Sequence, residues 1–211
     1  MLYKIRNWIF KHFKDNFTAY FTMCILLVVG IVVGAITIKV LNVEEKNQIL
    51  SFFNSFFKLL NKEDMNSSLL LKESLIGNMK TILIIWLTGV VIIGIPVIPI
   101  IVLLRGFAMG FTVGFLVNEF GLKGFLFSIF ALLPQNIFIV PGIISISSIG
   151  ISYSLNRVKG RKNRVLYKYS LTSFLNYSSI IFLFCILIVV GSLVEAYISP
   201  LFMKFIVDYV N

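Results

Sequence analysis

Four long runs of the chain contain no Asp, Glu, Lys or Arg. These runs are Phe17–Ile38, Thr81–Leu104, Gly124–Asn156 and Tyr169–Val194. Each is long enough to cross the hydrocarbon core of a bilayer, which takes ~20 predominantly apolar residues in a helix. One soluble core of this size could not bury all four runs. The pattern therefore predicts an all-α, polytopic integral membrane protein with a single membrane domain over residues 1–211.

Two stretches set the number of crossings. Residues 106–122, between Arg105 and Lys123, reach the lower length limit for a transmembrane helix. The run Gly124–Asn156 is too long for one straight crossing, because a helix of its length would span about 50 Å against a hydrocarbon core of about 30 Å. We therefore expect Pro134 and Pro141 to break this helix. Residues 124–133 would then be either a re-entrant segment or the first part of a kinked span.

The distribution of basic residues predicts the orientation, since Lys and Arg accumulate in cytoplasmic segments. The loop of residues 156–168 carries six basic residues and no acid, whereas residues 39–80 and 195–211 are nearly neutral. The N-terminal segment has a net charge of +3 from Lys4, Arg6, Lys11, Lys14 and Asp15. This favours a cytoplasmic N-terminus, an external C-terminus and a turn at Arg105. The five expected spans are residues 17–38, 81–104, 106–122, 134–155 and 171–194.

Composition and motifs narrow the function classes. Hydrophobic residues make up 58% of the chain and charged residues 13%, which is well below the ~25% of soluble domains. The cytoplasmic bias explains the net charge of +10, so nucleic acid is not an expected partner. His12 is the single histidine, and Cys24 and Cys185 lie inside apolar runs, so no metal site is indicated. The chain has no catalytic or cofactor-binding motif, and we expect neither an enzyme nor a bound cofactor.

The expected external loop, residues 39–80, contains an amphipathic helix. Its apolar residues recur at i, i+3, i+4 and i+7, and they are Ile49, Phe52, Phe53, Phe56, Phe57 and Leu60. One interpretation is a helix that lies on the outer leaflet or packs on the protein's own spans. The other is that Phe52, Phe53, Phe56 and Phe57 dock an extracytoplasmic partner.

Small residues predict a close contact between helices. Gly106, Gly110 and Gly114 recur every four residues and form a smooth stripe that permits close backbone approach. Packing within the chain is the first interpretation of this stripe, and self-association is the second.

Proline-containing segments and two amides mark the interior. Pro96 and Pro99 are expected to kink the second span. Gln135 and Asn136 follow Pro134 and, if buried, need hydrogen-bond partners on another helix. A solute site there is the alternative, although the sequence shows no ionisable group that would clearly lie within the membrane.

Two motifs carry a resemblance to a known family. The stretch Arg105–Leu126 reads RGFAMGFTVGFLVNEFGLKGFL, and Leu132–Gly142 reads LLPQNIFIVPG. Together they resemble the stage II sporulation protein M family of endospore-forming Firmicutes, and the length, basic N-terminus and outer loop fit that family as well. Relatives outside the sporulation branch often have Pro-His-Gly where this chain has Pro134-Gln135-Asn136, a departure that favours the sporulation branch.

The resemblance implies a non-enzymatic membrane scaffold of the engulfment machinery. Such a scaffold would recruit two hydrolases to the septal peptidoglycan, the stage II sporulation proteins D and P, and would lie in the mother-cell septal and engulfing membrane. In this chain the outward-facing segments, residues 39–80 and 195–211, would carry that role. The alternative is a membrane subunit of a permease or transporter, which the Pro-broken spans and the Gly-rich helix support.

Overall fold

The computed structural model describes residues 13–14, 16–61, 66–162 and 171–203, and the regular elements in these ranges are all helical. The expected all-α class is confirmed. Helix α2, Phe17–Thr37, continues into the short 3₁₀ turn η1, Ile38–Val40. The remaining elements are α3, Val43–Asn61; α4, Ser67–Val90; α5, Gly94–Lys162; α6, Leu171–Leu193; and the π-helical turn η2, Val194–Ile198.

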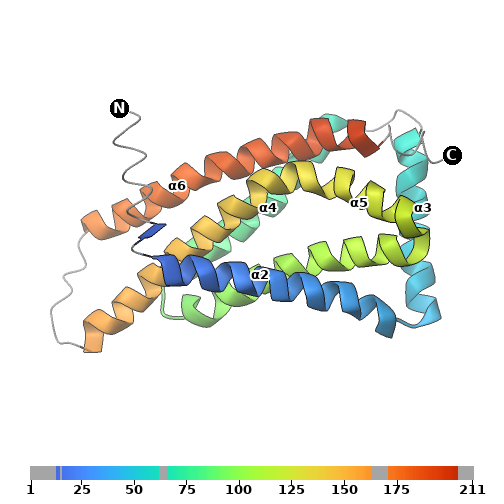
Figure 1. Ribbon diagram of the computed structural model, residues 1–211. Helices are drawn as coiled ribbons and strands as arrows, with labels where there is room; N and C mark the ends of the chain where they lie inside the picture. Colours follow the sequence, from blue (N-terminus) through green and yellow to red (C-terminus); the bar gives the residue numbers. More distant parts are fainter. Residues whose placement is uncertain (1–12, 15, 62–65, 163–170, 204–211) are drawn as a thin grey trace.

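Helix α5 is folded back on itself at Gly121. This glycine has φ 58° and ψ −135°, a conformation that side-chain-bearing residues rarely adopt. It separates a first half, residues 94–120, from a second half, residues 122–162. Figure 1 shows the two halves meeting at this turn and running back toward the other end of the molecule. One residue thus replaces a loop between two long helices.

Three helical stretches are long and apolar enough to cross a membrane: Phe17–Val40, Gly94–Val158 and Ser173–Met203. The outward faces of these stretches carry large apolar side chains that are more than half exposed, such as Phe21 and Phe182. Leu83 of the neighbouring α4 is exposed to a similar extent. Such an apolar surface is stable in contact with the hydrocarbon of a membrane, whereas its exposure to water would be unfavourable. Apolar side chains from α2, α4, α5 and α6 also form the core, which includes Met23, Ile85, Ile98, Ile143 and Ile188. The structure is therefore that of a membrane-associated helical bundle.

The chain reverses direction at Val91–Ile93, so the turn expected at Arg105 is wrong. Helix α4 ends at Val90, and α5 begins at Gly94 and runs through Arg105 without interruption. The residue ranges expected for the second and third spans, 81–104 and 106–122, are wrong for the same reason. Pro96 lies in the first turn of α5, where its missing N–H costs nothing. The hydroxyl of Ser154 donates to the carbonyl oxygens of Gly89 and Val91, at 2.7 and 2.9 Å, and holds the turn.

Pro134 and Pro141 do not break the helix as expected. Both lie inside the second half of α5, and the backbone departs from helical geometry at Gly121 instead. Residues 124–133 belong to this same continuous helix, which arches in Figure 1. The chain reverses at Gly121, at the end of the expected span 106–122, and the break expected at the prolines is absent.

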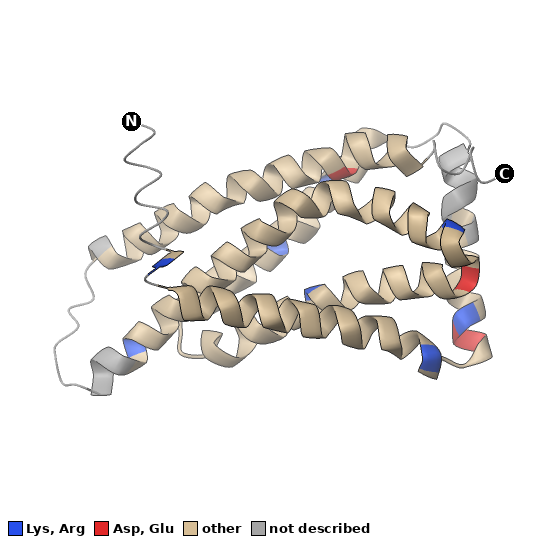
Figure 2. Cartoon of the chain, in the orientation of Figure 1, with Lys and Arg blue, Asp and Glu red and all other residues tan. Residues whose placement is uncertain are grey.

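Two ends of the bundle can be distinguished. Helix α3, the Gly121 turn and the end of α6 lie at one end, called the α3 end below (Figure 1). The beginnings of α2 and α6 and the end of α5 lie at the opposite end. Figure 2 shows most of the described charged residues near these ends and a few on the helices between them. The basic residues expected to orient the N-terminus, apart from Lys14, lie outside the described residues, as do His12, residues 163–168 and residues 204–211.

Candidate functional site in the bundle interior

Arg105 lies midway along the first half of α5, about 16 Å from its beginning at Gly94. Its Nη2 donates a hydrogen bond of 3.0 Å to Oδ1 of Asn78 on α4. The Asn78 side chain is almost fully buried, with 3% of its surface exposed. The guanidinium is therefore part of the helix–helix contact and does not mark an interface with water.

Asn78 extends this contact to a third helix. Its Nδ2 donates to Oγ of Ser192 on α6 at 3.0 Å and to Oγ of Ser74 at 3.4 Å. The Ser74 hydroxyl donates in turn to Oε2 of Glu195 at 2.6 Å. We call Ser74, Asn78, Arg105, Ser192 and Glu195 the polar cluster. The cluster connects α4, α5 and the C-terminal part of α6 through polar contacts.

The polar cluster contains one positive and one negative side chain, which lowers the cost of placing charges between helices. Arg105 and Glu195 carry opposite charges and attract each other across the cluster. A single charge inside a bilayer is costly, and such residues usually pair and mark functional sites. Glu195 also lies in the π-helical turn η2, a rare geometry that often occurs where a side chain has a special role.

Sequence reasoning missed the polar cluster. Arg105 was expected at a turn, whereas it lies within α5 and its guanidinium bonds Asn78 of α4. The external position of Glu195 stays a prediction, and its carboxylate contacts Ser74 of α4. The sequence did contain one indication of the polar cluster. Arg105 is a single charge between the apolar residues of Gly94–Leu104 and Gly106–Val117.

The two expected interior amides behave differently. Oε1 of Gln135 accepts a hydrogen bond of 2.6 Å from the hydroxyl of Ser199, so this side chain joins α5 to the helical residues just after η2, a tie to another helix as expected. Asn136 does not contact another helix, because its Nδ2 donates to the carbonyl of Leu132 within α5. Only Gln135 therefore serves as a tie between helices.

A cavity of about 210 Å³ lies next to the polar cluster. Glu195, Gln135 and Thr112 contribute polar groups to its walls, and most of the other lining residues are apolar, including Phe53 of α3. The described residues hold no group of three or more His, Cys, Asp or Glu side chains that could bind a metal ion. The chemistry that the site offers is hydrogen bonding and charge pairing.

The glycine stripe of α5 packs against α2. A Cβ at Gly106 or Gly110 would overlap the carbonyl oxygen of Leu27 or Ile31, and one at Gly114 would lie 2.9 Å from Cα of Ala35. Gly30 and Gly34 of α2, which the sequence reasoning overlooked, meet the backbone of α5 in the same way. The two helices thus approach each other through glycines on both sides, and α2 covers the stripe.

Helix α3 is present as expected, and the side chains of two of its four stripe phenylalanines, Phe52 and Phe53, are described. The ring of Phe53 stacks on Phe115 of α5, with centroids 5.4 Å apart. Phe52 is 69% exposed, and its ring meets that of Phe53 edge-on with centroids 6.1 Å apart. The side chains of Phe56 and Phe57 lie outside the described part of the structure. Phe53 is an anchor to the bundle, and Phe52 is available for other contacts.

Comparisons with known proteins give one match. No curated protein and no solved structure matches this chain. The model of the family described as Stage II sporulation protein M matches residues 23–200, which include most of α2, the polar cluster and both halves of α5. The chain therefore belongs to the stage II sporulation protein M family and has a role in sporulation.

Proposed function

We propose that this protein is a non-enzymatic, multi-pass scaffold of the cell membrane that recruits and localises peptidoglycan hydrolases at the septum during engulfment. Its partners would be the stage II sporulation proteins D and P, and its location the mother-cell septal and engulfing membrane. Family membership supports the sporulation role. The observation that carries the recruiting role is helix α3, whose Phe53 is fixed on the bundle while Phe52 remains exposed.

The proposal includes five crossings with the α3 end outside the cell. Five helical segments run between the two ends of the bundle: α2, α4, the two halves of α5, and α6. Arg157 and Lys162 lie in the last turns of the second half of α5, at the opposite end, and basic segments favour the cytoplasm. Under this orientation α3 faces the cell wall, where the hydrolases act.

Contacts at the α3 end supply a physical basis for recruitment. Aromatic side chains make strong anchors at protein interfaces, because they bury a large area with little loss of conformational freedom. Phe52 is such a side chain on a helix that the bundle already holds in place. A partner that covers Phe52 would therefore gain apolar burial without having to order α3.

The recruiting role can be tested with Phe52→Ser in sporulating cells. We expect less of the two hydrolases to co-purify with this variant at an equal membrane level, because the exposed aromatic anchor is removed. Leu122→Ser is the matched control, since Leu122 is also exposed, at 81%, and lies beside the Gly121 turn. Equal recovery of the hydrolases with the parent chain and Phe52→Ser would refute docking through α3. Failure of the parent chain to recover them at all would refute the scaffold.

A transporter subunit is the second candidate, and the polar cluster favours it. Arg105 and Glu195 carry opposite charges in one polar cluster, and Glu195 lines a cavity that Gln135 also lines. Charge pairs of this kind occur along substrate and proton pathways. Reconstituted protein that moves protons or a solute across vesicles, with the movement lost in Glu195→Gln, would support this candidate over the scaffold.

A further inference from the structure

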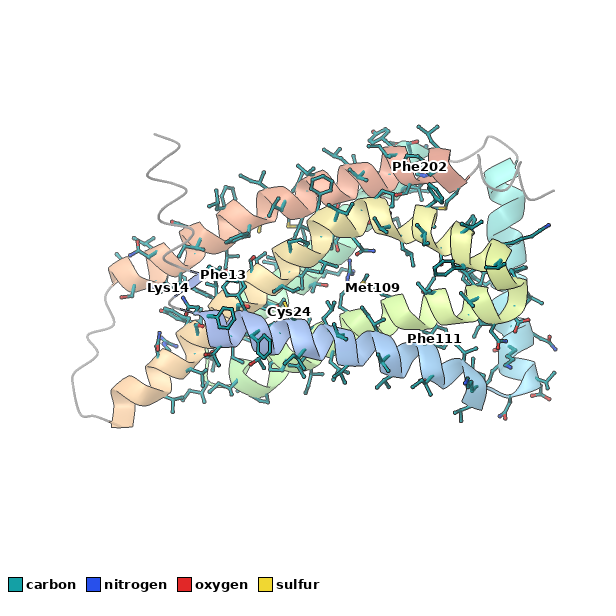
Figure 3. The ribbon with its side chains drawn as sticks, in the orientation of Figure 1. Phe13, Lys14, Cys24, Met109, Phe111 and Phe202 are labelled. Carbon is teal, nitrogen blue, oxygen red and sulfur yellow. The ribbon has the colours of Figure 1, made fainter. Side chains whose placement is uncertain are left out.

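The cavity of about 210 Å³ beside the polar cluster lies at the α3 end of the bundle and is partly open. Its walls come from α3, the beginning of α4, both halves of α5 near Gly121, and the residues that follow η2. Met203 is the last of these, and Figure 3 shows its neighbour Phe202 at the α3 end. Phe53 is a wall of the cavity and also meets the exposed ring of Phe52. A protein that covers Phe52 would therefore lie close to this cavity.

One wall of the cavity carries a negative charge that can accept a further partner. Oε2 of Glu195 accepts a hydrogen bond of 2.6 Å from Ser74, and Oε1 accepts none from the described residues. The link from Glu195 to Arg105 runs through Ser74 and Asn78, and no ion pair joins the two charged side chains directly. Arg105 does not line the cavity. A carboxylate oxygen is thus available to a donor, and a cationic donor makes the strongest hydrogen bond with it.

The other walls of the cavity are mostly apolar. Phe53 and Phe127 contribute aromatic rings, and Leu116 and Met203 contribute aliphatic surface. A ligand with an apolar stem and a cationic end matches this division. The stem would bury apolar surface while the charged end reaches Glu195, and the side chains of lysine and arginine have this form.

The cavity suits arginine better than lysine. Its volume of about 210 Å³ exceeds the ~150 Å³ that hold benzene in an engineered protein cavity, so the longer of the two side chains fits. A guanidinium is more weakly hydrated than an ammonium and costs less to bring into mostly apolar surroundings. Its planar face can also lie against an aromatic ring such as Phe53 or Phe127 while its N–H groups bond Glu195.

We propose that this cavity binds an arginine side chain of an extracytoplasmic protein that docks on the α3 end. The proposal rests on the scaffold role and adds a charged contact beside the aromatic contact at Phe52. The partner would cover Phe52 while its arginine enters the cavity between Phe53 and Glu195. This contact would select partners, because a protein without the arginine would cover the Glu195 carboxylate and leave it without a cation.

The cavity can be tested without any hydrolase, with N-acetylarginine amide as the probe. The full chain would be purified in an uncharged detergent, and binding would be followed by saturation-transfer NMR of the probe. N-acetylcitrulline amide is the matched ligand, because it has nearly the same shape and no charge. We expect the arginine amide to bind about tenfold more tightly or better, since its hydrogen bond to Glu195 is charge-assisted. Equal binding of the two amides, or binding of neither, would overturn the proposal.

Two variants assign the binding to this cavity. Glu195→Gln should remove the preference for the arginine amide, whereas Glu119→Gln should keep it, because Glu119 is an exposed carboxylate that does not line the cavity. Thr112→Phe would place a ring inside the cavity and should abolish binding of the amide. The Thr112 hydroxyl bonds only the carbonyl of Ala108 within α5, so this variant keeps every contact between helices. Unchanged binding by Thr112→Phe would show that the arginine does not enter the cavity.

Co-purification from sporulating cells tests whether a protein partner supplies the arginine. At equal membrane levels, we expect less of the two hydrolases to be recovered with Thr112→Phe than with the parent chain. Equal recovery would exclude an arginine of the hydrolases as the occupant and would leave recruitment through Phe52 standing. A parent chain that binds the arginine amide but recovers neither hydrolase would refute the scaffold together with this occupant.

Discussion

The guanidinium of Arg105 and the buried amide of Asn78 are joined by a hydrogen bond of 3.0 Å between α5 and α4. The same amide donates to Ser192 of α6, so one pair of residues sets the relative position of three helices. In hydrocarbon, apolar helix faces gain little from burial against each other compared with lipid. Directional contacts such as this one therefore contribute much of the specificity of the bundle.

Removing Arg105 should destabilise the bundle strongly. Arg105→Met leaves the Glu195 carboxylate without its opposite charge and Oδ1 of Asn78 without its donor. We expect the free energy of unfolding to fall by about 1.5–3 kcal/mol, because a buried amide loses a hydrogen bond to a charged group. Unfolding in mild detergent, followed by circular dichroism, measures the change. Lys80→Met serves as the control, because Lys80 is an exposed basic residue on α4.

The same pair can be examined with a double-mutant cycle. Arg105→Met combined with Glu195→Gln removes both charges, so we expect the double variant to be more stable than the sum of the single effects predicts. A coupling of about 1–3 kcal/mol is expected for residues in one network. Additive effects of the two substitutions would show that the charges do not interact through the polar cluster.

Gly110→Ala should separate α2 from α5. A Cβ at this position would overlap the carbonyl oxygen of Ile31, which is backbone and cannot rotate away. We expect a loss of about 1–3 kcal/mol in the free energy of unfolding, typical of overpacking. Gly77→Ala is a matched control, since a Cβ there meets no atom within 4 Å. Equal stability of the two variants would contradict the close approach of the helices.

Gly121→Ala should destabilise the protein without any steric clash. A Cβ at Gly121 also meets nothing within 4 Å, so the expected loss of about 1–3 kcal/mol arises from the positive φ alone. Gly77→Ala again provides the comparison, because Gly77 lies in the interior of α4, where alanine favours the helix by up to ~1 kcal/mol over glycine. The two substitutions should therefore shift the unfolding midpoint in opposite directions, and shifts of the same sign would disprove a strained turn at Gly121.

Cysteine labelling in intact cells should place the two ends on opposite sides of the membrane. In a background with Cys24 and Cys185 replaced by alanine, we expect an impermeant thiol reagent to label Asn47→Cys on α3 and not Lys162→Cys at the end of α5. Lysed cells should show labelling of both. Labelling of Lys162→Cys in intact cells would reverse the proposed orientation.

Apolar runs predicted the presence of helices well and their boundaries less well. Residues 17–38 and 171–194 correspond closely to α2 and α6, because each run is apolar and free of charge over the length of one helix. The boundary between α4 and α5 was misplaced because a charge was assumed to mark a membrane surface. Arg105 instead finds its partners inside the bundle, and a linear sequence does not show which distant residues, here Asn78 and Glu195, will meet it.

The candidate site was predicted only in part, because the sequence does not show which distant residues a polar side chain will contact. Gln135 forms the expected tie to another helix, whereas Asn136 bonds within its own helix, and nothing in the order of the two amides distinguishes them. The stripe of α5 glycines was visible in the sequence, but its partner, α2, became evident only from the packing. Gly30 and Gly34 share the same four-residue spacing and could have indicated that pairing.

The one-residue turn at Gly121 has a consequence for the biosynthesis of the protein. With no loop between its halves, α5 has only the polar residues Asn118, Glu119 and Lys123 to keep outside the hydrocarbon under the proposed five crossings. The halves would have to enter the bilayer together as a hairpin, with Gly121 leading. The backbone conformation of a single glycine then decides whether nearly seventy residues reach the membrane in the correct arrangement.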